Sequence, residues 1–252
     1  MPVMNDHAVA AQLARGAMER LLVLRQRYAA EGMDPIEWGA AADRVADDWL
    51  LGRLADLRPQ DIVLSEESPD PRHRLGQSRV WIIDPLDGSR EFSRPGRMDW
   101  AVHVALSVDG YAQAGAVALP DGTVLATEPA VVPSPDPSRP PRLVVSDSRA
   151  PDLAYRVAEK LGAEVVPMGS AGAKVAAVLR GRAELYLHAG GMRQWDSCAP
   201  VAVALAAGFH ASRIDGSPLR YNGADVNLPD LLVCRAELAA AALEAIVSSQ
   251  DG

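Results

Sequence analysis

The chain contains little cysteine and no long apolar run. Its two cysteines, Cys198 and Cys234, lie in apolar segments, which excludes a disulfide framework and favours a reducing compartment. The longest apolar stretches, residues 199–207 and 238–247, are too short or too interrupted to span a bilayer. The N-terminus also lacks the basic region and apolar run of a signal peptide. We therefore expect a cytoplasmic protein without a membrane partner.

Basic residues are also in deficit. The 252 residues include 33 acidic and 25 basic side chains, so the net charge is −8. A protein that binds nucleic-acid polymers needs a basic face, so this class of partner is excluded. A small anionic metabolite remains compatible, because bound metal ions reverse the local charge of a carboxylate-lined pocket. Apolar residues make up 48% of the chain, which is enough for a sizeable core.

Hydrophobic periodicity and turn residues predict an α/β protein. Predicted helices occupy residues 8–30 and 37–56, and short apolar strands follow at 61–64 and 80–83. An Asp-Gly turn predicts a β-hairpin from residues 100–108 and 111–119, with a further strand at 123–127. Later predicted strands are 143–145, 164–166, 184–187 and 231–234, and they alternate with helices at about 151–161, 171–180, 197–207 and 236–248. This alternation indicates layers of helices and sheets.

Five prolines in residues 131–142 predict a linker. We therefore divide the chain into an N-terminal α+β half, residues 1–130, and a C-terminal α/β half, residues 143–252. We expect the two halves to form one compact unit.

The most informative motif is residues 84–89, DPLDGS, directly after an apolar strand. Pro85 biases Asp84 to an extended conformation, and Gly88 permits a sharp turn with close approach to a ligand. Two carboxylates three residues apart, with the Leu86 carbonyl between them, can converge on hard cations. The alternative is a surface turn whose aspartates accept hydrogen bonds from local amides.

Two further segments carry acidic groups. Glu66 and Glu67 follow the strand at 61–64 and form either a solvated patch or a ligand pair. Asp196 in Trp-Asp-Ser-Cys-Ala-Pro precedes a helix of small residues, where its ordinary role would be an N-cap. An N-cap carboxylate is also well placed to meet a metal ion. The five histidines form no metal-ligand spacing, and we expect His103 to be a satisfied core residue.

Taken together, these three motifs resemble the signature motifs of the inositol monophosphatase superfamily, in order and at suitable separations, over nearly the whole chain. The resemblance implies a layered αβαβα sandwich of the inositol monophosphatase and fructose-1,6-bisphosphatase type. It also implies Mg²⁺-dependent, Li⁺-sensitive hydrolysis of a phosphate monoester in a small phosphorylated metabolite. Two or three Mg²⁺ ions are expected at the site.

The resemblance also assigns roles to residues. The implied metal ligands are Glu66, Asp84, the Leu86 carbonyl, Asp87, Asp196 and, in the second shell or at a third ion, Glu67. The implied catalytic residues are Glu66, Ser89 and Asp43, an acidic residue on an early helix whose usual threonine neighbour is alanine here. The expected substrate-binding residues are Gly88, Ser89, Arg90, Ser170 and Arg193. Further arginines weighed for a second phosphate are Arg94, Arg97 and Arg220.

The substrate expectation rests on two details. Arg90-Glu91-Phe92 after the DPLDGS motif is similar to the 3′(2′),5′-bisphosphate nucleotidase branch, which acts on 3′-phosphoadenosine 5′-phosphate in sulfur metabolism. Residues 186–194 lack the acidic residue that binds inositol hydroxyls. The alternatives are a broader phosphatase of fructose 1,6-bisphosphate, inositol phosphate or histidinol phosphate, and a non-catalytic metal- or phosphate-binding regulator.

Family members are monomers or dimers, and we favour a homodimer. The polar loop at residues 68–78 follows the glutamates and is a candidate lid that metal binding would order.

Overall fold

The computed structural model describes residues 4–130 and 139–250. Two long helices open the chain, α1 (Asp6–Ala30) and α2 (Pro35–Leu57). Asn5 and Asp34 cap them by accepting hydrogen bonds from Ala8 N and Ile36 N. Both helices agree with the sequence prediction within two residues.

The first sheet follows in the order β1-β2-β3-β4-β5. Its strands are β1 (Ile62–Ser65), β2 (Arg79–Asp87), β3 (Ala101–Val108), β4 (Tyr111–Ala118) and β5 (Val124–Ala126), with the short helices η1 (Arg72–Gly76) and α3 (Ser89–Phe92) between them. The predicted hairpin is confirmed: Val108 pairs with Tyr111, and the two turn residues between them have φ of 51° and 81°. Only β1 and β2 pair in parallel in this sheet.

The second sheet has the order β7-β6-β8-β10-β9. Its strands are β6 (Arg142–Ser146), β7 (Glu164–Met168), β8 (Leu185–Arg193), β9 (His210–Ser212) and β10 (Asn227–Cys234). The helices that accompany it are α4 (Asp152–Leu161), α5 (Ala171–Leu179), α6 (Gln194–Ala206), η2 (Ala236–Leu238) and α7 (Ala239–Gln250). The predicted linker falls mainly on residues 131–138, which lie outside the described residues, so the linker and the division into halves stay predictions.

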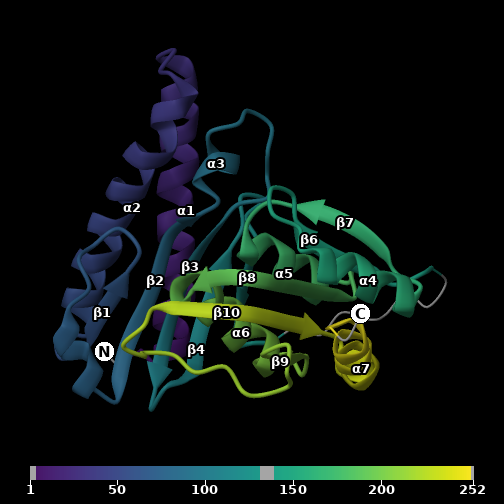
Figure 1. Cartoon of the computed structure of the whole chain (residues 1–252). Coiled ribbons are helices and arrows are strands. Elements are labelled where there is room, and N and C mark those ends of the chain that lie inside the picture. Colours follow the sequence, from purple (N-terminus) through teal and green to yellow (C-terminus); the bar gives the residue numbers. More distant parts are fainter. Residues whose placement is uncertain (1–3, 131–138, 251–252) are drawn as a thin grey trace.

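The helices and sheets form five layers (Figure 1), and three clusters of buried apolar residues hold these layers together. The first joins α1 and α2 to one face of the first sheet. The second places α5 and α6 between the two sheets, and the third packs α4 and α7 on the outer face of the second sheet. The order helix, sheet, helix, sheet, helix confirms the expected αβαβα sandwich.

Helix α6 begins earlier than expected. The sequence predicted a start at residue 197 with Asp196 as N-cap, but the helix starts at Gln194 and Asp196 lies in its first turn. The N-cap prediction is therefore wrong: Asp196 Oδ2 accepts a hydrogen bond from Arg193 N at 2.8 Å, as the third helical residue of a capping box does. Within residues 4–130 and 139–250, no helix is long and apolar enough to cross a membrane.

Candidate active site

The parallel pairing of β1 with β2 brings two acidic residues to one sheet edge. Ser65 pairs with Ile83, so the residues that follow them, Glu66 just beyond β1 and Asp84 within β2, lie at the same end of the two strands. Asp84 is only 1% exposed, whereas Glu66 is open to solvent. The apolar strands therefore place one buried carboxylate beside one accessible carboxylate.

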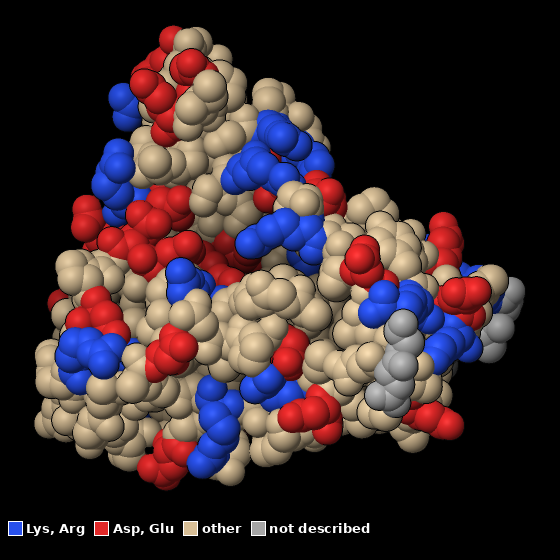
Figure 2. Space-filling view, in the orientation of Figure 1, with Lys and Arg blue, Asp and Glu red and all other residues tan. Residues whose placement is uncertain are grey.

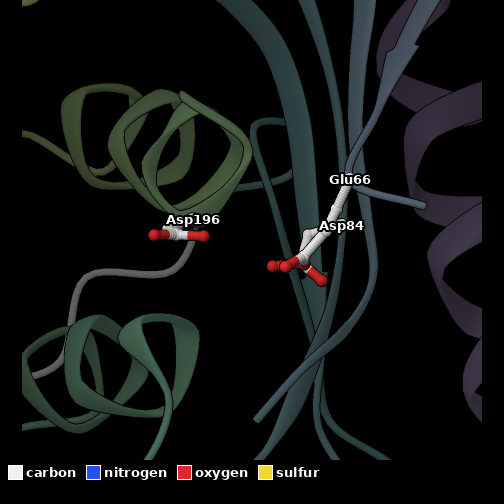
Figure 3. Close-up of side chains that lie close together, drawn as sticks. All are labelled: Glu66, Asp84 and Asp196. Atoms are coloured by element: carbon white, nitrogen blue, oxygen red, sulfur yellow. The ribbon is translucent and has the colours of Figure 1, made fainter. Parts of the chain in front are cut away.

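Asp196 completes a three-carboxylate cluster from the other half of the chain. One oxygen each of Glu66, Asp84 and Asp196 lies within 4.8 Å of the others, and Figure 3 shows Asp196 at the start of its helix facing the other two side chains. Three converging oxygen donors fit a hard divalent cation such as Mg²⁺. The cluster can therefore hold at least one such ion.

Burial and mutual repulsion raise the pKa values of all three groups. Burial, followed by the charges of Glu66 and Asp87, raises the pKa of Asp84 well above its usual value. The carboxyl group of Glu66 faces the cluster and is more buried than the residue as a whole, and this burial with the charge of Asp196 raises its pKa to about 7. Burial and the charge of Asp87 raise the pKa of Asp196 to about 6. Without a cation the cluster therefore retains protons near neutral pH, and a bound cation would replace them.

The turn after Asp84 is built as its sequence suggested. Leu86 N donates to Asp84 Oδ1 at 3.1 Å, and the Leu86 carbonyl oxygen lies 3.2 Å from Ser89 Oγ. Gly88 has a φ of 96°, and a Cβ there would lie 3.1 Å from the Cβ atoms of Ser170 and Trp100. A side chain at residue 88 would therefore strain the turn and crowd the pocket.

Asp87 lines the same pocket but is not one of the three clustered carboxylates. Its oxygens accept hydrogen bonds from Ala171 N at 3.3 Å and Gly172 N at 2.7 Å, at the start of α5. His103 Nε2 lies 3.2 Å from Asp87 Oδ2, and His103 Nδ1 donates to the Trp195 carbonyl at 3.1 Å. His103 is buried, as expected, but its position between the end of β2 and the start of α6 was not predicted.

Asp43 and Ser89 form the predicted pair. Ser89 Oγ donates to Asp43 Oδ2 at 2.7 Å across 46 residues of sequence. Asp43 is 5% exposed, and its Oδ1 has no hydrogen-bond partner among the described residues. Burial raises the pKa of Asp43 to about 8, although the Ser89 hydroxyl opposes the rise. The unpartnered oxygen is therefore available to a water molecule, and without a nearby cation the raised pKa leaves this carboxyl largely protonated at neutral pH.

The cavity has a volume of about 370 Å³, and its walls differ in charge. Figure 2 shows acidic side chains inside a depression and basic side chains along its edge. The wall opposite the carboxylates is formed mainly by the second half, with Ser146, Ser148, Arg149, Gly169, Ser170, Lys174, Tyr186, His188 and Arg193. Burial lowers the pKa of Lys174 to about 8. The sequence did not predict the contributions of Arg149, Tyr186 and His188, because they depend on how the second sheet faces the first.

Among the residues expected to bind substrate, the arginines already have protein partners. Arg90 Nε donates to Glu91 at 2.7 Å, and the guanidinium also contacts Asp147. Arg193 NH1 donates to Asn227. Both line the cavity, as do Gly88, Ser89 and Ser170, but Arg94, Arg97 and Arg220 do not.

Glu67 is not one of the three clustered carboxylates. It is exposed and does not line the cavity, and burial followed by the charge of Asp47 raises its pKa. A role of Glu67 at a third ion stays a prediction.

Hydrogen bonds of Arg74 hold the centre of the candidate lid at residues 68–78 in place. Arg74 is fully buried and donates to Asp70 at 2.7 and 2.9 Å. It also donates to Asn222 Oδ1 at 2.8 Å and to the Gly223 carbonyl at 3.1 Å. These bonds to the second half do not support a freely moving lid.

Comparison with known proteins gives concordant matches. The sequence model of the inositol monophosphatase family matches residues 4–131 and 139–250. The 3′-phosphoadenosine 5′-phosphate phosphatase of Mycobacterium leprae is 48% identical, over 94% of this chain and 91% of that protein. The 3′(2′),5′-bisphosphate nucleotidase CysQ of Salmonella typhimurium is 32% identical, over 83% of this chain and 91% of that protein.

Solved structures agree with these matches. The crystal structure of CysQ from Bacteroides thetaiotaomicron, described as a bacterial member of the inositol monophosphatase family, superposes with a TM-score of 0.71 at 25% identity. The match covers 90% of this chain and 96% of that chain. Sequence, fold and relatives lead to one conclusion: the chain belongs to the inositol monophosphatase family.

Proposed function

We propose that the chain is a Mg²⁺-dependent 3′(2′),5′-bisphosphate nucleotidase. It would remove the 3′-phosphate of 3′-phosphoadenosine 5′-phosphate and release AMP and inorganic phosphate. The family and the named phosphatase relatives make the chain a metal-dependent phosphoric monoester hydrolase. The observation that carries the proposal is the convergence of Glu66, Asp84 and Asp196 in a cavity with a basic opposite wall.

The clustered carboxylates Glu66, Asp84 and Asp196 would hold the first Mg²⁺. For a second and a third ion we propose the Leu86 carbonyl, Asp87 and Glu67 as additional ligands. Bound there, Mg²⁺ would supply Lewis acidity, which lowers the pKa of a coordinated water and stabilises charge on the phosphoryl oxygens.

Two residues of the chain would then orient the attacking water and accept its proton. Asp43 Oδ2 holds the Ser89 hydroxyl, so this hydroxyl is fixed and its oxygen lone pairs face a defined direction. We propose that the pair orients the water and that Asp43 accepts its proton. A general base needs a pKa near the working pH. Burial raises the pKa of Asp43 to about 8, and Mg²⁺ bound nearby would lower it again, which would leave the carboxylate ready to accept the proton.

The basic wall supports a substrate with a second phosphate. Arg149, Lys174 and Arg193 face the cavity, and guanidinium and ammonium groups bind phosphate oxygens well. No acidic residue occurs between Tyr186 and Arg193, although these residues contribute to the cavity wall. This composition favours a nucleoside bisphosphate over inositol phosphate.

The test is phosphate release with Mg²⁺ from a panel of substrates. The panel contains 3′-phosphoadenosine 5′-phosphate, inositol 1-phosphate, fructose 1,6-bisphosphate, histidinol phosphate and AMP. We expect the bisphosphonucleotide to lead by tenfold or more in kcat/KM, which corresponds to about 1.4 kcal/mol in transition-state binding. A sugar or polyol phosphate in the lead would support the broader phosphatase, and metal binding without hydrolysis would support a regulator.

The proposal includes the cellular setting. Sensitivity to Li⁺, a cytoplasmic location and a place in sulfur metabolism accompany the nucleotidase function. Both cysteines are free and buried, which suits a reducing compartment. The homodimer stays a prediction. Light scattering of the protein as it elutes from a size-exclusion column would check it by measuring the molar mass.

A further inference from the structure

A second buried aspartate on α2 lies one helical turn after Asp43. Asp47 is 4% exposed and does not line the cavity. Its two oxygens accept short hydrogen bonds from Ser65 Oγ at 2.5 Å and Ser68 Oγ at 2.6 Å. Each is a charge-assisted bond, about twice as strong as a neutral one.

The two serines flank the glutamates. Ser65 ends β1, Glu66 and Glu67 follow, and Ser68 closes the turn. Ser65 Oγ also accepts a hydrogen bond from Glu67 N at 3.3 Å. One carboxylate on α2 therefore fixes both ends of the four-residue turn that carries Glu66.

Glu66 depends on this support more than Asp84 does. Asp84 belongs to β2 and is held there by its pairing with His103 of β3. Glu66 lies beyond the end of β1 and is exposed, so the backbone of its turn sets where its carboxylate lies. Partners that orient metal ligands commonly alter metal affinity by 10–100-fold when they are removed.

We propose that Asp47 is a positioning residue that sets the affinity of the metal site by holding Ser65 and Ser68 on either side of Glu66. The inference rests on the proposed function, because only there does Glu66 bind a metal. Asp47 itself touches neither the cavity nor the clustered oxygens, so its effect passes through the two serines.

The direct test is calorimetric titration of Mg²⁺ into the metal-free, full-length chain without substrate. Asp47→Asn keeps the side-chain volume but loses the charge and one acceptor oxygen. We expect this variant to bind Mg²⁺ about tenfold more weakly than the wild type. Asp48→Asn is the matched control: it removes the same charge from the adjacent, exposed residue of α2, and its affinity should equal that of the wild type.

Serine variants separate positioning from charge. The double variant Ser65→Ala/Ser68→Ala retains the Asp47 charge but removes both hydroxyl groups, and it should lose the same affinity. Adding Asp47→Asn to this double variant should not weaken Mg²⁺ binding further, because the effects of interacting residues are not additive. If the effects of the serine and aspartate changes simply add, the proposed route through the serines is wrong.

Kinetics and stability give the second readout. With saturating Mg²⁺, Asp47→Asn should recover kcat and KM within about threefold, because the tenfold loss lies in ion binding. Unchanged Mg²⁺ affinity together with a lowered melting temperature would show a merely structural role and overturn the inference. If Asp47→Asn does not fold, wild-type Mg²⁺ affinity in Ser68→Ala overturns it.

These results are distinguishable from failure of the proposed function. A wild-type chain that binds no Mg²⁺ would overturn both proposals. Normal binding by the wild type with equally tight binding by Asp47→Asn would overturn only the role of Asp47.

Discussion

Replacing Asp196 with asparagine should stabilise the metal-free protein while it abolishes catalysis. In the folded chain Asp196 faces two other carboxylates, and its pKa rises from 3.8 to about 6 by burial and the charge of Asp87. The backbone contact from Arg193 N survives, because the amide oxygen of asparagine also accepts a hydrogen bond. The substitution therefore removes charge repulsion and changes little else.

The size and pH dependence of the effect follow from linkage. An acid whose pKa is higher in the folded state destabilises the fold once pH exceeds its unfolded value. The rise from 3.8 to about 6 corresponds to at most about 3 kcal/mol. The advantage of Asp196→Asn should be small at pH 4, grow up to pH 6 and stay constant at higher pH. For a chain of this length it equals a rise in Tm of about 5–10 °C.

Thermal unfolding followed by circular dichroism, with chelator at pH 4.5 and pH 8, measures this difference. Asp48→Asn serves as the control on an exposed aspartate. Excess Mg²⁺ should reverse the order, because an ion that binds only the native wild type stabilises it by mass action. The electrostatic reasoning would be refuted if Asp196→Asn were no more stable than the wild type at pH 8. It would also be refuted if the variant melted above the wild type by the same margin at pH 4.5 and at pH 8.

Three further predictions concern the same site. Asp43→Asn and Ser89→Ala should each lower kcat at least 100-fold with wild-type Mg²⁺ affinity, and near-normal kcat in either would count against the proton role. Gly172→Ala should destabilise the fold by about 1–3 kcal/mol, because a Cβ there would lie 2.1 Å from His103 Nε2. Gly52→Ala, which meets nothing within 4 Å, should instead add about 0.5–1 kcal/mol, and equal melting temperatures for the two variants would contradict the packing. Chelation should stop phosphate release and added Mg²⁺ should restore it, whereas turnover in chelator would exclude a metal-dependent reaction.

Local patterns predicted the end of β1 before Glu66 within one residue, whereas β2 continues beyond the predicted residues 80–83 to Asp87. Apolar runs of strand length followed directly by acids determine where Glu66 and Asp84 emerge. The parallel register of β1 and β2 places Glu66 beside Asp84. This register depends on the packing of the whole fold and could not be predicted from the residues of either strand.

The start of α6 was misjudged for a local reason. Aspartate is a favoured N-cap residue and small apolar residues follow Asp196, so the prediction placed the helix start at residue 197. The helix instead accommodates Pro200 after a first turn that begins at Gln194. Pro200 has no N–H to donate to the Asp196 carbonyl four residues earlier, so that carbonyl lacks its helical partner.

Long-range contacts were beyond sequence reasoning. The apolar strand around His103 predicted that it would be buried, but its contact with Asp87 depends on the register of β2 against β3. The hydrogen bonds of Asp47 likewise join residues 18 and 21 positions apart. The pairing of Asp43 with Ser89 was expected only through the family resemblance.

The division of the clustered carboxylates between the two halves has a consequence for biosynthesis. Asp196 follows Asp84 by 112 residues, so at about 10 residues per second the ribosome adds it roughly 10 s later. The strand before it, β8, is flanked in the sheet by β10, which ends only at Cys234. A nascent chain therefore carries Glu66 and Asp84 without their third carboxylate until β8 and the start of α6 have been synthesised.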